Sequence, residues 1–126
     1  MKIHISQIDR ITLLSETEPV AANVTIISDP KPVGGYTHIV GFIFSDVASA
    51  LNGVIIEQAM SLADFPPGVP ATTNVTRSIF TLAANDTITN TYSVQIVAPF
   101  VRIIYINGAL PQTSFRAFLE ARVLRG

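Results

Sequence analysis

The sequence predicts an all-β fold, a jelly-roll-like β-sandwich, and three observations support this prediction. Ile, Val and Thr, which suit a pleated and half-buried surface, are abundant. Several segments alternate apolar with polar residues, and Gly, Pro and Asn interrupt the chain between them. No segment shows a sustained apolar period of about 3.6 residues with capping residues at its ends. A small closed barrel is the main alternative.

The clearest alternation lies in residues 101–106 and 113–124. Val101, Ile103 and Tyr105 are predicted to face the core, and Arg102 faces the other way. In the last segment every second residue from Phe115 to Val123 is apolar, so this side is also assigned to the core. Further strands are expected at residues 2–14, 23–28, 36–44, 54–60, 75–83 and 92–97.

Two segments leave alternatives open. Residues 36–44 are almost wholly apolar, which is typical of a strand buried on both faces or of one whose outer face meets another chain. Residues 45–53 fit a short helix, with Ser45 or Asp46 as the cap and Gly53 as the end, or a polar turn between two strands.

The chain has one candidate boundary, between Asp29 and Gly35, where two prolines and two glycines break it. Residues 1–30 are predicted to form an N-terminal arm with strands, or else to belong to the same domain as the rest. Residues 31–126 are predicted to form the sandwich body.

The chain is poor in charge. Charged residues make up 13% of the sequence, against about 25% in an average soluble domain, and the net charge is −1. We interpret this composition as that of a protein that covers much of its surface with contacts to neighbouring molecules. A monomer with a surface rich in Thr and Asn is the alternative.

Several function classes find little support in the sequence. Cysteine is absent, so the chain has no disulfide, no thiolate metal site and no cysteine nucleophile. The lysines and arginines are scattered, so we do not expect nucleic-acid binding. No apolar run approaches the ~20 residues that span a membrane, so we do not expect membrane binding. His4 and His38 lie in no nucleophile motif. We therefore predict no catalytic residue, no cofactor and no metal. Glu57 and Glu120 are expected in cross-strand ion pairs, with Arg102, Arg116 or Arg122 as partners, and a glycosidase pair is the alternative.

Three groups of residues are candidates for protein contacts. The first is the polar side of the last strand, which mixes arginine and glutamate with an aromatic ring, as interface patches often do. The second is an uncharged loop rich in proline, and the third is the N-terminal arm, which is predicted to add a strand to a neighbour's sheet. Their members are Arg116, Phe118, Glu120 and Arg122; Phe65, Pro66 and Pro67; and Ile3, Ile5 and Ile8.

Aromatic residues also suggest a second kind of ligand. Tyr36, Tyr92 and Tyr105 are amphipathic and are the candidates for a sugar-binding platform, although the chain has no tryptophan. Tyr92 and Tyr105 share the apolar side of their strands, which favours a place in the core.

Three separated stretches, Val54–Gln58, Tyr92–Ala109 and Gln112–Arg116, resemble a set of small β-sandwich proteins of tailed phages, of the capsid decoration or cement kind. Those proteins have strands of the type I-E-Q-S, then V-x-A-P-Y-V-R-V-x-Y-x-N-G-A, then Q-T-x-F-R-L, and the similarity covers residues 53–124. This sequence departs from the pattern after Gln58, where Ala63–Gly68 replaces the usual Asp-Gly-x-x-Trp turn.

The resemblance implies a virion protein on the capsid surface. Its partners would be the major capsid protein and its own copies, as a homotrimer, and it would stabilise the capsid by binding across neighbouring subunits. A receptor- or carbohydrate-binding module of a phage tail or fibre is the alternative. A hydrolase with paired carboxylates and His38 in one pocket is the third hypothesis.

Overall fold

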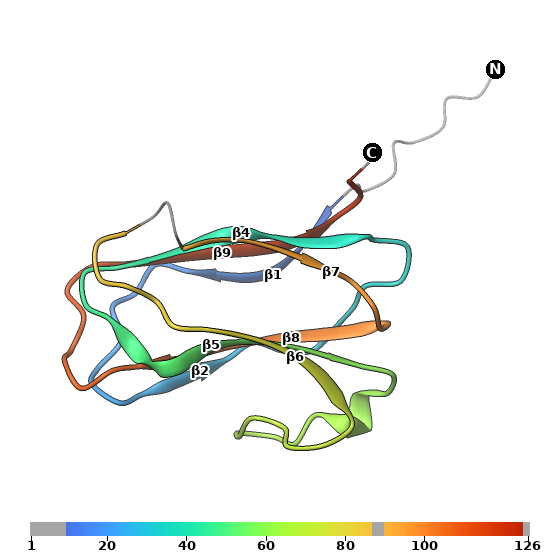
Figure 1. The fold of residues 1–126 in the computed structure, drawn as a ribbon, viewed down its shortest axis with the longest axis horizontal. Helices are drawn as coiled ribbons and strands as arrows, with labels where there is room; N and C mark the ends of the chain where they lie inside the picture. Colours follow the sequence, from blue (N-terminus) through green and yellow to red (C-terminus); the bar gives the residue numbers. More distant parts are fainter. Residues whose placement is uncertain (1–9, 87–89, 125–126) are drawn as a thin grey trace.

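The computed structural model describes residues 10–86 and 90–124 of the chain. Two antiparallel sheets lie face to face, one above the other in Figure 1, with the core between them. The only helical segment in the described residues is one short 3₁₀ turn, η1 (Leu62–Asp64). The predicted all-β sandwich is confirmed.

The strands of the described residues divide into a four-stranded and a five-stranded sheet. The order in the first is β1-β9-β4-β7, and the order in the second is β2-β8-β5-β6, with the short β3 also paired to β8. The first sheet consists of β1 (Arg10–Glu16), β9 (Phe115–Arg122), β4 (His38–Ser45) and β7 (Thr91–Gln95). The second consists of β2 (Thr25–Ile27), β3 (Lys31–Pro32), β8 (Phe100–Asn107), β5 (Ser49–Ala59) and β6 (Val75–Phe80).

The strand pairing is nested along the chain. β5 pairs with β6, β4 with β7, β2 and β3 with β8, and β1 with β9. The chain is therefore one long antiparallel ribbon, and the additional pairs β4·β9 and β5·β8 form where this ribbon wraps around the core. This connectivity is that of a jelly roll.

The core between the sheets follows the predicted alternation. Val101, Ile103 and Tyr105 of β8 are fully buried in it, and so is the apolar side of β9 from Phe115 to Ala121. Tyr92 also belongs to the core, and burial raises the pKa of its hydroxyl to about 12. Two of the three tyrosines considered for sugar binding are thus core residues.

Two points that the sequence left open can be compared with the structure. β1 lies in one sheet and β2 in the other, so residues 10–30 are part of the sandwich and the break at Asp29 to Gly35 divides no domains. The short helix predicted at residues 45–53 is wrong. β4 ends at Ser45 and β5 begins at Ser49, so only residues 46–48 form the connection between the strands and residues 49–53 belong to β5.

One end of the sandwich is held by buried amide side chains. The Asn107 side chain donates to the carbonyl oxygens of Val20, Ala21 and Leu110, each at 3.0–3.1 Å. Gln112 accepts from the Val20 amide at 2.7 Å and donates to the Tyr105 hydroxyl at 3.0 Å. These bonds draw the connections between β1 and β2 and between β8 and β9 together at that end.

Candidate protein-binding face

The outward side of the β2-β8-β5-β6 sheet is covered by the chain itself. Five apolar residues are buried although they lie outside the main core cluster. Three of them point outward from the sheet, and two belong to residues 61–74, which run beneath β5 in Figure 1 and are called the proline loop below. They are Ile55, Ala59 and Ile104 from the sheet and Phe65 and Ala71 from the loop. We call this outward side the closed face.

Arg102 of β8 anchors the proline loop to the closed face. Its Nε lies 2.6 Å from Glu57 Oε1, and its two terminal nitrogens donate to the carbonyl oxygens of Pro66 at 2.7 Å and Val69 at 2.6 Å. Phe65 packs against the guanidinium, 5.1 Å from ring centre to Cζ. Arg102 and Glu57 are 2% and 0% exposed, so this ion pair is buried and all three nitrogens of the guanidinium are engaged.

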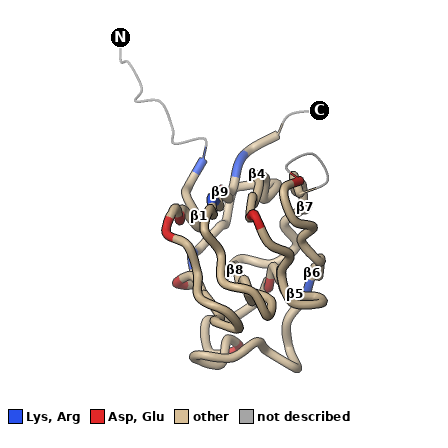
Figure 2. Tube along the Cα trace, turned by 90° about the vertical axis from the view of Figure 1, so that its left-hand side faces the viewer, with Lys and Arg blue, Asp and Glu red and all other residues tan. Residues whose placement is uncertain are grey.

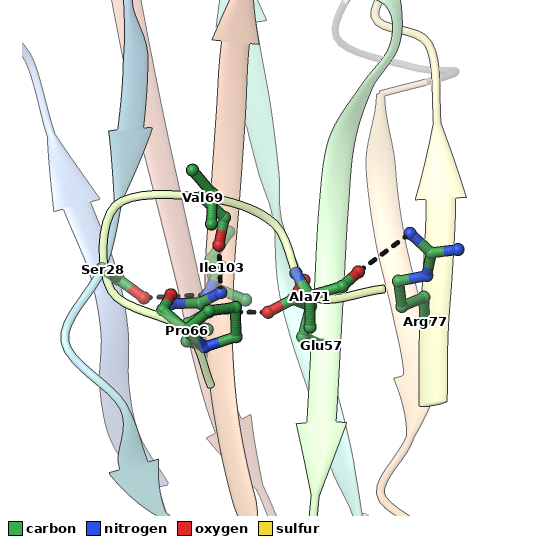
Figure 3. Close-up of polar contacts among 8 residues, drawn as sticks. Ser28, Glu57, Pro66, Val69, Ala71, Arg77 and Ile103 are labelled. Atoms are coloured by element: carbon green, nitrogen blue, oxygen red, sulfur yellow. Dashed lines mark hydrogen bonds and ion pairs between the residues drawn. The ribbon is translucent and has the colours of Figure 1, made fainter. Parts of the chain in front are cut away.

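The second oxygen of Glu57 holds the other arm of the same loop (Figure 3). Glu57 Oε2 accepts from the Ala71 amide at 2.7 Å, and Arg77 of β6 donates to the Ala71 carbonyl at 3.2 Å. A buried carboxylate needs such partners, because an unpaired buried charge is costly. The Glu57–Arg102 pair thus joins β5, β8 and the proline loop. The predicted cross-strand ion pair of Glu57 is confirmed.

The outward side of the other sheet, which we call the open face, has no such loop across it in the described residues. Paired strand residues share a face, so the pairs Val40↔Glu120, Phe42↔Phe118 and Phe44↔Arg116 all point outward. The side chains of Val40, Phe42, Phe44 and Phe118 are only half-buried. They form an apolar row across the two central strands, β4 and β9.

Charged groups flank this row. Glu120 is nearly buried between Arg122, at 3.2 Å, and Arg10, at 4.0 Å, and both arginine side chains are largely exposed. Arg116 is exposed at the other end of β9. Charged residues are sparse elsewhere along the chain, as the mostly tan trace in Figure 2 shows. The open face therefore combines half-buried phenylalanines with exposed arginines, which is the composition found in the centres of protein interfaces.

A shallow cavity of about 260 Å³ opens on the same face. Phe42, Phe118 and Arg116 line one side, and Ser15, Glu16 and Thr17 at the end of β1 line the other.

The close approach of β4 to β9 is possible because residue 41 is glycine: a Cβ there would lie 1.9 Å from the Phe118 carbonyl oxygen.

The structure separates the residues that the sequence grouped as candidates for contacts. Arg116, Phe118, Glu120 and Arg122 lie together on the open face, although Glu120 is nearly buried. Phe65 is 7% exposed and packs within the protein, so its predicted place at a partner surface is corrected. Pro66 is half-buried and Pro67 is exposed. Ile3, Ile5 and Ile8 lie outside the described residues.

The carboxylates considered for hydrolysis do not meet. Glu57 lies on the closed face and Glu120 on the open face, so the two point away from each other on opposite sides of the sandwich. His38 accompanies Arg122 on the open face, and its Nδ1 lies 2.9 Å from the Thr37 hydroxyl oxygen. Residues 10–86 and 90–124 contain no group of three His, Asp or Glu side chains placed to hold a metal ion.

The stretches that carry the sequence resemblance contact one another in space. Glu57 pairs with Arg102, and the neighbouring Gln58 accepts from the amides of Val97 at 2.7 Å and Ala98 at 3.3 Å. At the far end, Asn107 and Gln112 form the amide network described above. These residues support the fold, so the shared pattern reports on architecture.

Comparisons with known proteins found no matching family model, no matching curated protein and no matching solved structure. The helices in the described part of the chain include none of the length and apolar character required to cross a membrane.

Proposed function

We propose that this protein is a virion structural protein, which decorates a phage capsid and stabilises it by binding across neighbouring capsid subunits. The single observation that carries the proposal is the open face, with Phe42 and Phe118 half-buried between exposed arginines. The resemblance of residues 53–124 to decoration proteins is our reason for proposing the capsid surface as the location.

The protein covers one outward face with its own loop and leaves the other uncovered. Both faces carry apolar residues on their central strands. Aromatic and arginine residues contribute most of the binding energy when a partner excludes water from them. A capsid subunit that covers the open face would exclude water in this way, and burial of ~1,600 Å² would be a standard interface.

The many identical sites on a capsid would strengthen the overall binding. A capsid offers many identical sites, and a homotrimer, the oligomer we propose, would bind several of them at once with a gain in avidity. The residues before β1 remain our candidate for a strand added to a neighbour's sheet. The test for them is removal of residues 1–9, because β1 itself begins at Arg10 and a longer deletion would damage the sandwich. Unchanged capsid retention and unchanged oligomer mass would reject this role.

The experiment for the main proposal uses heads that lack this protein and measures cosedimentation with the purified chain. Wild type is expected to bind, and Phe118→Glu is expected to lose binding. Ile79→Glu is the matched control, because Ile79 is a partly exposed strand residue of the other sheet, and its binding is expected to stay unchanged. Equal binding by Phe118→Glu and wild type would overturn the role of the open face.

The main competing function is carbohydrate or receptor binding at a tail or fibre. Jelly rolls serve in lectins as well as in capsids, so the fold alone fits both. A wild-type chain that ignores heads and binds defined sugars in a glycan array would overturn the capsid proposal in favour of this alternative.

A further inference from the structure

A bulge in β5 displays one leucine at the end of the sandwich. β5 pairs with β8 at Ser49↔Asn107 and next at Val54↔Tyr105, so four residues of β5 stand against one of β8. Asn52 takes a left-handed conformation, with φ of 57°, and a Cβ on Gly53 would lie 2.6 Å from the Ile106 carbonyl oxygen. Leu51, between Ala50 and Asn52, is 82% exposed. A β-bulge changes the direction in which side chains point, and this one presents a large apolar group to solvent.

Two more exposed apolar side chains lie near this bulge. Val24 and Leu110 are 43% and 63% exposed. The Val24 carbonyl accepts from the Asn107 amide at 2.9 Å, and the Leu110 carbonyl accepts from the Asn107 side chain at 3.0 Å. Asn107 is in turn the cross-strand partner of Ser49, at the start of the bulge. We call residues 17–24, 46–53, 81–86 and 107–114 the loop end.

The loop end carries only negative charge. It contains Glu18, Asp46 and Asp86 and has no lysine or arginine. Hydrogen bonds from the Thr113 hydroxyl and the Ser114 amide lower the pKa of Asp46 and keep its carboxylate ionised. The open face carries three arginines, of which two are engaged with Glu120. The loop end is thus apolar and acidic, whereas the open face is apolar and carries three arginines against two glutamates, Glu120 and, at the cavity, Glu16.

We infer that the open face of one copy binds the loop end of a second copy, with Leu51 inserted in the cavity beside Phe42 and Phe118. The cavity of about 260 Å³ has an apolar wall for the leucine, with Arg116 on the same side to meet the acidic groups and Glu16 on the other side. This inference rests on the proposed function, because it takes the open face to bind protein. It assigns the part of that face around the cavity to a second copy of this chain and leaves the part around Val40, Glu120 and Arg122 to the capsid.

Such a contact is heterologous, since two different surfaces of the same chain meet. Heterologous contacts produce rings when the rotation closes and filaments when it does not. The loop end and the open face are neighbouring sides of the molecule, at the left and the top of Figure 1. A contact between neighbouring sides rotates each copy relative to the previous one, so we expect a small closed ring.

The test is the mass of the purified full-length chain in solution, measured by light scattering after size exclusion. Wild type is expected to be a ring, and Leu51→Glu and Phe118→Glu are each expected to weaken self-association by more than about tenfold. Val97→Glu is the control, because Val97 is also exposed but lies in the loop between β7 and β8, and it should keep the wild-type mass. Unchanged thermal unfolding of Leu51→Glu shows that its fold is intact.

Mixing the two variants gives the decisive result. Leu51→Glu keeps an intact open face and Phe118→Glu keeps an intact loop end, so an equimolar mixture is expected to form dimers that extend no further. A symmetric contact would leave both variants monomeric in the mixture and would overturn the inference. Wild type that is monomeric, or Leu51→Glu with wild-type mass, would overturn it too.

The same variants separate this inference from the proposed function. If Leu51→Glu keeps the wild-type mass while Phe118→Glu loses head binding, the contact between copies is wrong and the capsid proposal stands. If Leu51→Glu and Phe118→Glu dissociate the ring and the mixture forms dimers, while every variant binds heads as wild type does, the contact between copies stands. The role of the open face in head binding is then wrong.

Discussion

The two outward faces of this sandwich both carry apolar residues, but they differ in how these residues are covered. On the closed face, Ile55 and Ile104 are buried, and a buried ion pair holds the proline loop against the sheet. On the open face, Phe42 and Phe118 stay half-buried, and beside them the exposed Arg122 pairs with the nearly buried Glu120. The difference indicates that the chain covers one outward face with its own loop and leaves the other, the face that we propose for partners, uncovered.

The ion pairs show the same contrast on the scale of single groups. Arg102 is engaged by a carboxylate, two carbonyl oxygens and an aromatic ring, all supplied by the chain itself. Arg122 contacts Glu120 and remains 45% exposed. Fully engaged arginines stabilise the fold, whereas exposed ones beside aromatic residues are available to a partner.

The largest effect is expected from Arg102→Met. This change removes three hydrogen bonds to the guanidinium and leaves the Glu57 carboxylate buried without its partner, which costs about 3–5 kcal/mol. The measurement is the free energy of unfolding in urea. Arg116→Met on the open face is the control and is expected to stay within about 0.5 kcal/mol of wild type. Equal losses from the two changes would contradict the distinction between the faces.

A smaller difference is expected between two phenylalanines. Phe65→Ala removes a buried ring of the closed face and its contact with Arg102, at a cost of about 3 kcal/mol. Phe118→Ala removes a half-buried ring of the open face and is expected to cost about 1–2 kcal/mol. Limited proteolysis should cut Phe65→Ala within residues 61–74 faster than wild type or Phe118→Ala. A Phe118→Ala variant as unstable as Phe65→Ala would show that Phe118 is a core residue.

Double-mutant cycles compare the two ion pairs directly. The cycle of Glu57→Leu and Arg102→Met is expected to give a coupling energy of about 2–3 kcal/mol, because each single change strands a buried charge. The cycle of Glu120→Leu and Arg122→Met should give about 0.2–1 kcal/mol, since Arg122 is exposed and water screens the pair. Similar coupling energies in both cycles would indicate that water is excluded equally from the two ion pairs.

The sequence predicted the inner side of the sandwich better than its outer sides. Strand alternation assigned Tyr105 and Leu119 to the core correctly, because a period of two residues reports which side is apolar. The same pattern does not report what covers an outward side. Ile55 and Ile104 signal a covered closed face, yet the covering segment follows from a fold in three dimensions, and for this reason Phe65 was assigned to a partner surface.

Local patterns also fell short at the loop end. Residues 45–53 fit a helix by their capping residues, but pairing of β5 with the distant β8 decides their structure. The bulge that displays Leu51 depends on the position of the Ile106 carbonyl beside Gly53, which no local pattern contains. The sequence grouped only the β9 part of the open face, Arg116 to Arg122, because these residues lie along one strand, and it missed Phe42 and Phe44 of β4.

The smallest expected effect concerns Asp46. Its carboxylate accepts hydrogen bonds from a connecting segment at the surface, as the Glu57 carboxylate does beneath the proline loop. Its carboxylate accepts from the Thr113 hydroxyl and from the amides of Thr113 and Ser114, and these bonds lower its pKa from the ordinary value of 3.8. The charged form is therefore favoured in the folded protein. The stability from this shift is fully present above pH 3.8 and is lost as the pH falls through the lowered value.

Asp46→Asn tests this directly, because the amide resembles the protonated acid in shape and charge. The difference in melting temperature between wild type and Asp46→Asn should be greatest near neutral pH and should shrink as the solution is acidified towards about pH 2. Glu18→Gln, which removes another acid of the loop end, controls for the general effect of charge. A gap for Asp46→Asn that stays constant down to that pH would mean that the ionised carboxylate does not hold the connection between β8 and β9.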